Sequence, residues 1–413
     1  MDMPPLRTAV LKDKRPRLTG RGFLLFSVVA LLLAPLLWGQ RPQSAAPAKP
    51  PSGPVARLSG LNISRINDPN SRDLIAPHSR GNAVVRAEIL LDRLNFSPGE
   101  ITDTYNDNLG NAVKAFQSAN GLPASGIVDS ATWTALNERQ GAGQTQTGGD
   151  AQKPQNTGED QSNAPPASQP QPTGDPPTRA IIPYVISNED VAGPFTKLPR
   201  VTGRDAGGQL MLKEAKRRQL NYESPLELLA EKFHSSPRLL VELNPRKIFS
   251  KAGAELQVPD VQSPLPTDAA SVVVDASTRT VTALAGDGKV LATYPATVGS
   301  VHDPLPVGTW KVVEVTWYPH FKYNPNLFWD AGNKNARAVL PPGPNNPVGI
   351  VWIGLSKEHY GIHGTPQPSR IGVTESHGCI RLTNWDAGEL GKMVHVGTPI
   401  VLQGTAPPIQ SNK

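Results

Sequence analysis

The sequence contains a single cysteine, Cys379, among 413 residues. A single cysteine excludes a disulfide within the chain, and without a C-x-x-C pair the zinc sites built on paired thiolates are excluded as well. The H-E-x-x-H motif of zinc hydrolases is also missing. By itself Cys379 is either a small buried side chain or a reactive thiol, and its neighbours must decide between the two.

A dense surface of basic and aromatic residues is the next feature that the sequence lacks. The net charge is +6, but residues 1–21 contain six basic and two acidic residues, so only +2 is left for the rest of the chain. Nucleic-acid-binding proteins concentrate Lys and Arg on one surface, and we therefore expect no nucleic acid among the partners. The chain has 43 prolines and 37 glycines instead, which indicates linkers between domains.

The basic start runs into an apolar stretch, FLLFSVVALLLAPLLWG, at residues 23–39. A charged segment before a short apolar run is typical of an export signal, and we interpret residues 1–40 as a signal peptide or membrane anchor. Basic residues before the run predict that the rest of the chain lies outside the cytoplasm, in the periplasm or cell envelope. If the run is not removed, the inner membrane becomes a partner.

Two polar segments and a short tail lie outside the compact parts of the chain. Residues 41–80 are rich in Pro, Ser and Arg and predict a disordered tether, whereas residues 141–180 contain almost no apolar side chain and predict a disordered linker. Residues 405–413 form a tail. The remaining ranges, 81–140, 181–260 and 270–404, have the periodic apolar patterns of folded domains.

Residues 81–140 predict three short helices around one small core. Apolar residues recur at helical spacing, Ser130 is placed to cap the third helix, and Gly121 to end the second. The core positions expected from this pattern are Val84, Ala87, Leu91, Leu94, Leu109, Ala112, Val113, Phe116, Trp133 and Leu136.

The stretch AVKAFQSANGL, followed by GIVDSATWTAL, resembles the peptidoglycan-binding module of cell-wall enzymes. The resemblance implies a domain that binds peptidoglycan, with its ligand surface expected on the loop from Phe96 to Tyr105 and near Asp129. A generic three-helix bundle without a ligand is the alternative.

Residues 181–260 predict two helices in YESPLELLAEKFHSSPRLLVELNP and a closing strand in GAELQVP. This order resembles a degenerate LysM unit, which implies glycan binding. A structural spacer is the alternative, and the sequence does not assign glycan contacts.

From Ser271 onward the apolar pattern changes to a period of two, which is typical of β-strands. SVVVDASTRTVTALAGDGKVLATYPATVG predicts three strands with a tight turn at AGDGK, and GTWKVVEVTWYP, VGIVWIGL and VGTPIVLQ predict further strands. The clearest helix begins at Thr383 or Asn384, either of which can cap it. The chain is thus predicted to be a multidomain α+β protein whose last domain is a mostly-β sandwich or open barrel.

The neighbours of Cys379 favour a reactive thiol. A thiol attacks as thiolate, its ordinary pKa is near 8.5, and a nearby histidine supplies the base that it needs. His363 ends a separate strand and can approach the sulfur across the site, so it is the predicted base, while His377 would shape the pocket or orient substrate. The backbone at Gly378 could stabilise an oxyanion, and Arg381 could bind a carboxylate.

The stretch HGTPQPSRIGVTESHGCIRLTNWDAGEL resembles the signature of the L,D-transpeptidase (YkuD-type) catalytic domain. The resemblance covers roughly residues 270–403 and implies a β-rich fold with a cysteine nucleophile and neither cofactor nor metal. It also implies substrate contacts for four further residues. The matching positions are His363, Gly364, Ser376, His377, Gly378, Cys379, Arg381 and Asn384, of which Gly364, Ser376, Arg381 and Asn384 are the substrate contacts.

By this resemblance the substrate is a peptidoglycan tetrapeptide stem that loses D-Ala to form a thioacyl-enzyme. An amine of another stem, or of an anchored envelope protein, would then accept the acyl group. With water as the acceptor the enzyme would be an L,D-carboxypeptidase.

Several less specific interpretations remain open from the residues alone. The chain could be a wall-binding protein without catalysis, or His363, His377 and Cys379 could be zinc ligands. Arg381 could form a surface ion pair with Asp386 or Glu389, and Asn384 could serve only as a helix cap.

Overall fold

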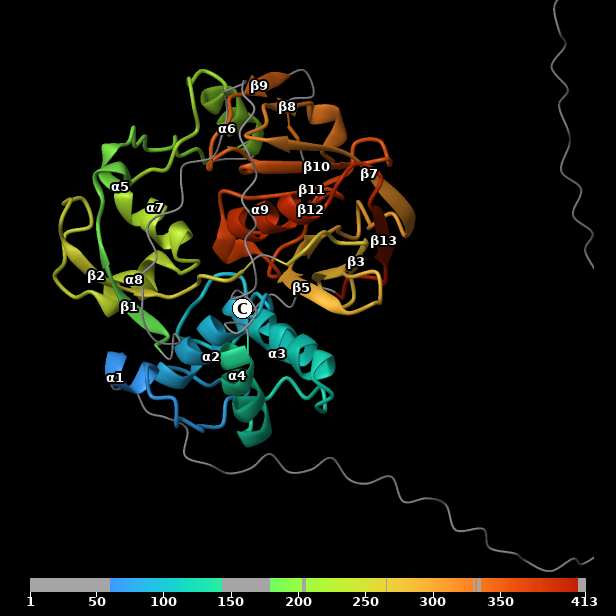
Figure 1. Ribbon diagram of the computed structural model, residues 1–413. Coiled ribbons are helices and arrows are strands. Elements are labelled where there is room, and N and C mark those ends of the chain that lie inside the picture. The colour runs from blue at the N-terminus through green and yellow to red at the C-terminus, as the bar shows by residue number, and fades with distance from the viewer. Residues whose placement is uncertain are drawn as a thin grey trace, which may run out of the picture. The chain divides into compact units, whose positions relative to one another are not determined.

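The computed structural model describes residues 60–142, 179–202, 206–264, 266–329, 331–332 and 336–407 (Figure 1). All of these belong to the second of two compact units, Gly53–Lys413. The predicted leader at residues 1–40 lies outside the described residues, as do residues 41–59 of the predicted tether and residues 143–178 of the predicted linker. Residues 60–80 were also predicted to be disordered tether, and this is wrong, because they contain a short helix and bury Ile66 and Ile75 against the folded part. Within the described ranges, none of the helices combines the length and the apolar character that crossing a membrane requires.

The N-terminal part of the described chain is helical, as predicted. Its helices pack around a common core that contains the apolar positions expected from the sequence, with Leu94 half-buried at the margin. The helices of this core are α2 (Asn82–Arg93), α3 (Asp107–Ala119) and α4 (Ser130–Ala142). A short preceding helix, α1 (Ile63–Ile66), instead packs Ile66 in a separate cluster with Val85 and Ile89 of α2.

Side-chain caps set the ends of these helices. Helix α3 ends before Gly121, whose φ of 69° is the left-handed conformation that glycine adopts without strain. At the start of α4, Oδ1 of Asp129 accepts the Thr132 N–H at 2.8 Å. The cap is therefore Asp129 rather than the predicted Ser130, which is the first helical residue.

Residues 181–260 contain the two predicted helices and the closing strand, together with a first strand that the sequence analysis did not predict. Strands β1 (Ile181–Val185) and β2 (Glu255–Pro259) pair antiparallel. Pro183 in the middle of β1 obscures the strand pattern. The helices are α5 (Asn188–Ala192), α6 (Ala206–Glu214), α7 (Pro225–Lys232) and α8 (Pro237–Leu243), and apolar side chains of α7 and α8 form a core with β2.

The C-terminal part is built on a nine-stranded sheet with the order β5-β4-β3-β13-β7-β10-β11-β12-β6. The edge strands β5 and β6 are separated in the chain by Ala296 alone, so the sheet curls back on itself as an open barrel, one of the two predicted forms. The strands are β3 (Ser271–Asp275), β4 (Thr280–Leu284), β5 (Val290–Pro295), β6 (Thr297–Val298), β7 (Gly308–Trp317), β10 (Val351–Leu355), β11 (Gly361–His363), β12 (Ile380–Arg381) and β13 (Pro399–Gln403).

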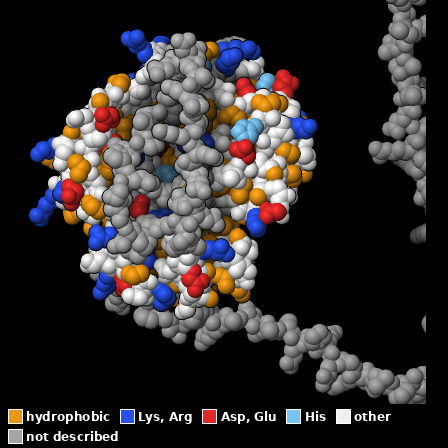
Figure 2. Space-filling view, viewed as in Figure 1, with side chains coloured by type: hydrophobic (Ala, Val, Ile, Leu, Met, Phe, Trp, Pro, Cys, Tyr) orange, Lys and Arg blue, Asp and Glu red, His pale blue; other side chains and the backbone are white. Residues whose placement is uncertain are grey.

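Smaller elements complete this part. Strands β8 (Phe321–Tyr323) and β9 (Ala338–Leu340) form a separate pair. Two short 3₁₀ turns cover Pro325–Leu327 and Pro368–Arg370. Helix α9 (Asn384–Met393) packs against β10 and β11 and is capped by Thr383, one of the two predicted caps. On the face shown in Figure 2, Lys and Arg side chains are scattered and form no basic patch.

The loop from Phe96 to Tyr105 is not a free surface. Its first residues bond to the edge of β5: Ser97 N–H donates to Thr293 O at 2.9 Å, and Thr293 N–H donates to Asn95 O at 2.8 Å. Ile101 N–H donates to His234 O after α7, at 2.7 Å, and Phe96 and Ile101 are buried. Phe96 and Ile101 are therefore not available to a ligand, and the predicted ligand surface of this loop is limited to its half-buried residues, 100 and 102–105.

Candidate functional site

Three adjacent strands carry the predicted site. Trp352 of β10 pairs with His363 of β11, which pairs in turn with Arg381 of β12, so these side chains share one face of the sheet. The alternate residues point to the opposite face, where Ile353, Ile362 and Ile380 belong to the barrel core. The predicted period of two therefore places the functional residues on the face away from the core.

Cys379 lies immediately before β12, next to Gly361. The Cys379 Sγ is 3.6 Å from the main-chain oxygen of His359, and the Gly361 backbone forms a hydrogen bond with the sulfur. Ser376 fixes the turn because its Oγ donates to the Cys379 main-chain oxygen at 2.6 Å. Ser376 thus acts on the backbone of the cysteine.

Gly378 has a conformational reason to be glycine. Its φ is 101°, and a Cβ there would lie 2.9 Å from Cε1 of the Tyr360 ring. Any larger residue would therefore be strained and would push against Tyr360. The close approach of this ring to the Gly378 backbone makes Tyr360 a wall of the site that the sequence analysis missed.

The thiol of Cys379 is protonated at neutral pH. The residue is partly exposed, but enough protein surrounds its sulfur that burial raises the pKa of Cys379 to about 11. The Gly361 hydrogen bond and the charge of Arg381 lower this pKa, but they do not outweigh burial.

His363 is held as a neutral base with a defined tautomer. Nδ1 is 2.7 Å from the Gly364 main-chain oxygen. A carbonyl oxygen only accepts, so Nδ1 carries the hydrogen and Nε2 presents a lone pair. Burial lowers the pKa of His363 to about 4, and Arg381 acts in the same direction. A neutral imidazole and a neutral thiol therefore face the same side of two neighbouring strands.

His377 lies against aromatic side chains. Its ring is 4.8 Å from the Phe328 ring centroid and 5.8 Å from that of Trp329. Trp329 also contacts His302, at 4.3 Å between centroids. These residues come from segments well before the S-H-G-C motif, so this part of the site could not be read from local sequence.

Arg381 is turned toward the segment before the motif. Its Nη2 donates to the Glu375 main-chain oxygen. Its positive charge lowers the pKa of both Cys379 and His363. No described ion pair joins it to Asp386 or Glu389, the partners considered as an alternative.

Asn384 and Gly364 form a contact beneath the His363 segment. The Asn384 Nδ2 donates to Glu231 Oε2 at 3.0 Å and to Pro344 O at 3.1 Å, and its Oδ1 accepts the Ile350 N–H at 3.3 Å. A Cβ on Gly364 would lie 2.3 Å from this Oδ1. Asn384 is 2% exposed, and both its Nδ2 and its Oδ1 form hydrogen bonds within the protein. The geometry therefore favours a role in positioning the His363 segment over the predicted contact with substrate.

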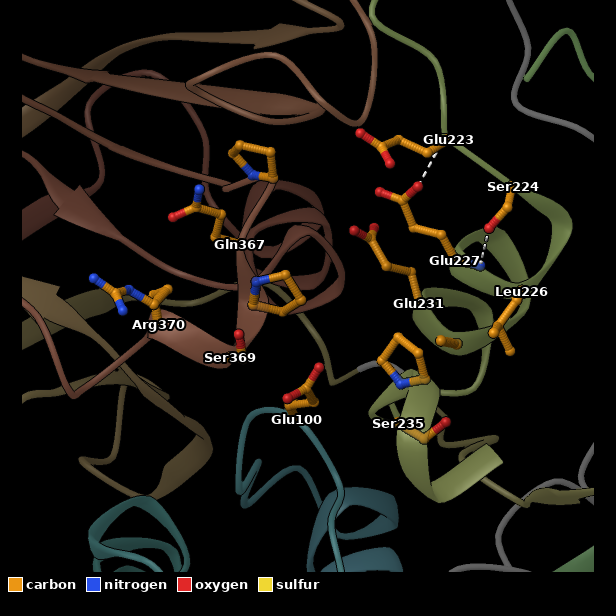
Figure 3. A pocket seen from close by; sticks show the side chains of 14 residues that line it. Glu100, Glu223, Ser224, Leu226, Glu227, Glu231, Ser235, Gln367, Ser369 and Arg370 are labelled. Carbon is orange, nitrogen blue, oxygen red and sulfur yellow. Dashed lines mark hydrogen bonds between the residues drawn. The ribbon is translucent and has the colours of Figure 1, made fainter. Parts of the chain in front are cut away.

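A separate cavity of about 570 Å³ lies where residues 223–237 face the segment after His363 (Figure 3). The side chains of Glu223, Glu227 and Glu231 project from the α7 side toward Gln367, and Glu100 approaches from below in this view. Burial raises the pKa of Glu231 to about 8 and that of Glu100 to about 7. The cavity is not lined by Cys379 or His363 and is distinct from the cysteine site.

Within the described ranges, no three His, Cys, Asp or Glu side chains are grouped so that they could hold a metal ion. His363, His377 and Cys379 thus do not form the zinc-ligand set considered from the sequence.

Comparisons with known proteins identify the family of the chain. The model of the YkuD L,D-transpeptidase catalytic domain matches residues 269–402, and that of a peptidoglycan binding domain matches residues 80–136. A YkuD protein of Bacillus licheniformis, described as a candidate L,D-transpeptidase, is 32% identical over 177 residues, which cover 42% of this chain and 91% of the relative. Its Bacillus subtilis counterpart is 30% identical over 185 residues, covering 45% and 96%.

Among solved structures, an L,D-transpeptidase from Xylanimonas cellulosilytica covers 81% of this chain and 100% of its own, with 14% identity and a TM-score of 0.32. The chain belongs to the L,D-transpeptidase family. The predicted mostly-β catalytic domain and the helical peptidoglycan-binding part are confirmed.

Proposed function

We propose that Cys379 is the nucleophile of this L,D-transpeptidase and that His363 is its general base. The observation that carries the proposal is the hydrogen bond between His363 Nδ1 and the Gly364 carbonyl, which leaves the Nε2 lone pair available. The register of β11 and β12 supports this assignment, because His363 pairs with Arg381 and Cys379 lies two residues before Arg381, with the same parity. A thiol and a neutral imidazole so arranged are suited to nucleophilic acyl transfer.

The first half-reaction transfers the acyl group to sulfur. Nε2 of His363 removes the thiol proton as the sulfur attacks the carbonyl of the diaminopimelate–D-Ala bond in a tetrapeptide stem. The carbon–nitrogen bond breaks, the imidazolium returns the proton to the departing amine, and D-Ala leaves. Because both groups are neutral at rest, proton transfer accompanies attack and no preformed ion pair is needed. Backbone amides near Gly378 and Cys379 hold the oxyanion.

The second half-reaction releases the enzyme. An amine of another stem attacks the thioester and gives its proton to His363, the carbon–sulfur bond breaks, and the thiol is restored. An amine of an anchored envelope protein could take the same place. Water in that place would give L,D-carboxypeptidase activity, which shares the acyl-enzyme.

The other predicted site residues support this chemistry in different ways. Arg381 binds a substrate carboxylate, and His377 with its aromatic neighbours shapes the pocket. Ser376 holds the turn that carries the thiol, while Gly364 and Asn384 support the His363 segment from beneath.

The remaining parts of the chain hold the enzyme at an insoluble substrate. Binding of peptidoglycan by the helical domain raises the effective concentration of catalyst at the wall. The helix pair and two-stranded sheet at residues 181–260 support a LysM-like glycan-binding unit. Export through the leader at residues 1–40 would place the enzyme in the periplasm or envelope.

The Cys379→Ala variant tests the nucleophile. We expect no D-Ala release from purified tetrapeptide muropeptides, because no other described thiol can form the acyl-enzyme. Mass spectrometry of the wild type should show the protein plus the stem less D-Ala, and the product masses distinguish cross-linked stems from hydrolysed ones. Retention of full activity by Cys379→Ala, or loss of wild-type activity in EDTA, would contradict the proposal.

A further inference from the structure

Trp352 occupies a slot that two glycines create beside the catalytic pair. Its indole lies 5.6 Å from the His363 ring, centroid to centroid, with 23° between the planes. On the neighbouring strand a Cβ at Gly361 would lie 2.6 Å from Cη2 and Cζ2 of the indole. On its own strand a Cβ at Gly354 would lie 3.1 Å from the indole Nε1. A side chain at Gly361 would therefore displace the ring, and one at Gly354 would crowd it.

The slot lies beside the catalytic pair, on the β10 side of His363. Gly354 pairs with Gly361 in the sheet, and the Gly361 backbone forms a hydrogen bond with the Cys379 sulfur. The indole lies across this pair of glycines and stacks on the His363 ring. It thus contacts the base directly and covers the glycine whose backbone bonds to the nucleophile.

A hydrogen bond fixes the ring in its plane. Trp352 Nε1–H donates to Glu314 Oε1 at 3.0 Å, from the strand on the other side of β10. The same Glu314 side chain fills the space that a Cβ at Gly354 would take, with its Cγ at 2.7 Å. Glu314, Gly354 and Gly361 together leave the indole one orientation.

We propose that Trp352 is a positioning residue for the catalytic imidazole. Its indole covers one face of the His363 ring, keeps water from it and holds the orientation in which Nδ1–H bonds to Gly364 and Nε2 is free. Glu314 acts through Trp352 by fixing the indole. The inference rests on the proposed role of His363 and extends it to two residues outside the motif.

If Trp352 has this role, removing its indole should change the pKa of His363. The charged or titratable groups around the imidazole are Arg381 and Cys379 on the next strand, and Glu314 behind the indole. Loss of the indole lets water reach the His363 ring and weakens the burial that lowers its pKa to about 4. The pKa then moves up toward its ordinary value of about 6.5.

The test is Trp352→Leu, with Trp352→Phe as the conservative variant. We expect Trp352→Leu to lower kcat/KM for D-Ala release by about 10- to 100-fold, mostly through kcat, because misplacement of a catalytic group has costs of this size. The acid limb of its pH profile should move up toward pH 6.5. Trp352→Phe, which keeps an aromatic face, should recover much of the loss, and Glu314→Ala should shift the same limb by less.

A second readout needs no turnover. In ¹⁵N NMR of the His363 ring, the wild type should show the Nδ1–H tautomer down to low pH, and Trp352→Leu should show mixed tautomers and a raised pKa. Trp317→Leu, in a half-exposed tryptophan that packs on α9, controls for loss of a large ring. Thermal unfolding confirms that each variant is folded.

A double substitution isolates the slot. Gly361→Ala alone must displace the indole, because the added Cβ collides with it. In the Trp352→Leu background the same Cβ has space. The loss of kcat/KM in the double variant should therefore be smaller than the sum of the losses in the two single variants. An unchanged acid limb and an unchanged tautomer in folded Trp352→Leu would overturn the proposal. The role of Cys379 would stand in that case, because it is tested separately by Cys379→Ala.

Discussion

At the scale of single residues, the site combines a base that is hard to protonate with a thiol that is hard to ionise. Burial is the main cause in both cases, and it acts in opposite directions because the charged form is the protonated imidazole but the deprotonated thiol. With these pKa values, almost all of the Cys379 thiol is protonated at neutral pH before substrate binds. We therefore expect the thiol proton to pass to His363 only when the sulfur attacks a bound substrate.

This state predicts the pH dependence of alkylation. With a pKa of about 11 for Cys379, the thiolate fraction grows about tenfold per pH unit across the neutral range. The rate of iodoacetamide modification of the folded protein should therefore keep rising from pH 7 to pH 10, as followed by mass spectrometry. A plateau near neutral pH would instead show a thiolate–imidazolium pair. The unfolded protein, with an ordinary thiol pKa near 8.5, is the control.

At the scale of elements, the strand carrying the base is supported from beneath by α9. Gly364 follows β11 and packs directly on the side-chain oxygen of Asn384, the first residue of that helix. The same amide bonds to Glu231 of α7 and to the loop at Pro344. A single buried side chain thus connects the base-bearing segment to two helices and a loop.

Gly364→Ala should disturb this support. Its Cβ would lie 2.3 Å from Asn384 Oδ1, so either the helix or the His363 segment has to move. We expect a loss of about 1–3 kcal/mol in the free energy of unfolding, as for other overpacked sites, together with reduced D-Ala release. Denaturant titration measures the first effect. Gly286→Ala, at a turn position with no atom near the added Cβ, should be close to neutral.

The elements also show how far the sequence could predict this site. The S-H-G-C-I-R motif and the period of two were sufficient to predict the longer strands and to bring Cys379 and His363 to neighbouring strands, while their catalytic roles stay a prediction. Trp352 was missed because the alternating pattern of a strand does not show whether an aromatic residue lies on the core face or on the face that carries the site. Strands β6 and β12 have two residues each, which is too short for an alternating sequence pattern to be detected. Asn384 was assigned to substrate because its partner Glu231 is remote in the chain.

At the scale of the whole described molecule, buried ionisable side chains gather where its parts meet. His234 bonds to Asp92 of α2 at 3.0 Å and stacks on Trp385 of α9. Burial lowers the pKa of His234, but Asp92, Glu389 and Asp386 raise it to about 9. Glu231 has its pKa raised to about 8 by burial. These contacts join segments that are far apart in sequence.

Stability should therefore fall as the solution becomes alkaline. A group whose pKa is higher in the folded than in the unfolded state stabilises the fold below its unfolded value and loses that contribution as pH rises through its folded value. For His234 this window runs from about 6.5 to about 9, and for Glu231 from about 4.5 to about 8. The melting temperature should decline between pH 6 and pH 9.

Glu231→Gln provides the matched test. Glutamine keeps an acceptor oxygen for Asn384 but does not ionise, so the variant should lose less stability than the wild type over the same range. The difference in slope should not exceed about 1.4 kcal/mol per pH unit, the limit for one proton. Identical melting profiles for the two proteins would mean that Glu231 does not titrate in this range.

The hydrogen bonds between the Phe96 loop and β5 have a consequence for solubility. Thr293 would otherwise present its N–H and C=O at an open sheet margin, where a second chain could add a strand. The wall-binding domain occupies that position with its own backbone at Asn95 and Ser97. The N–H and C=O of Thr293 are therefore already paired within the chain and are not available to a strand from another molecule.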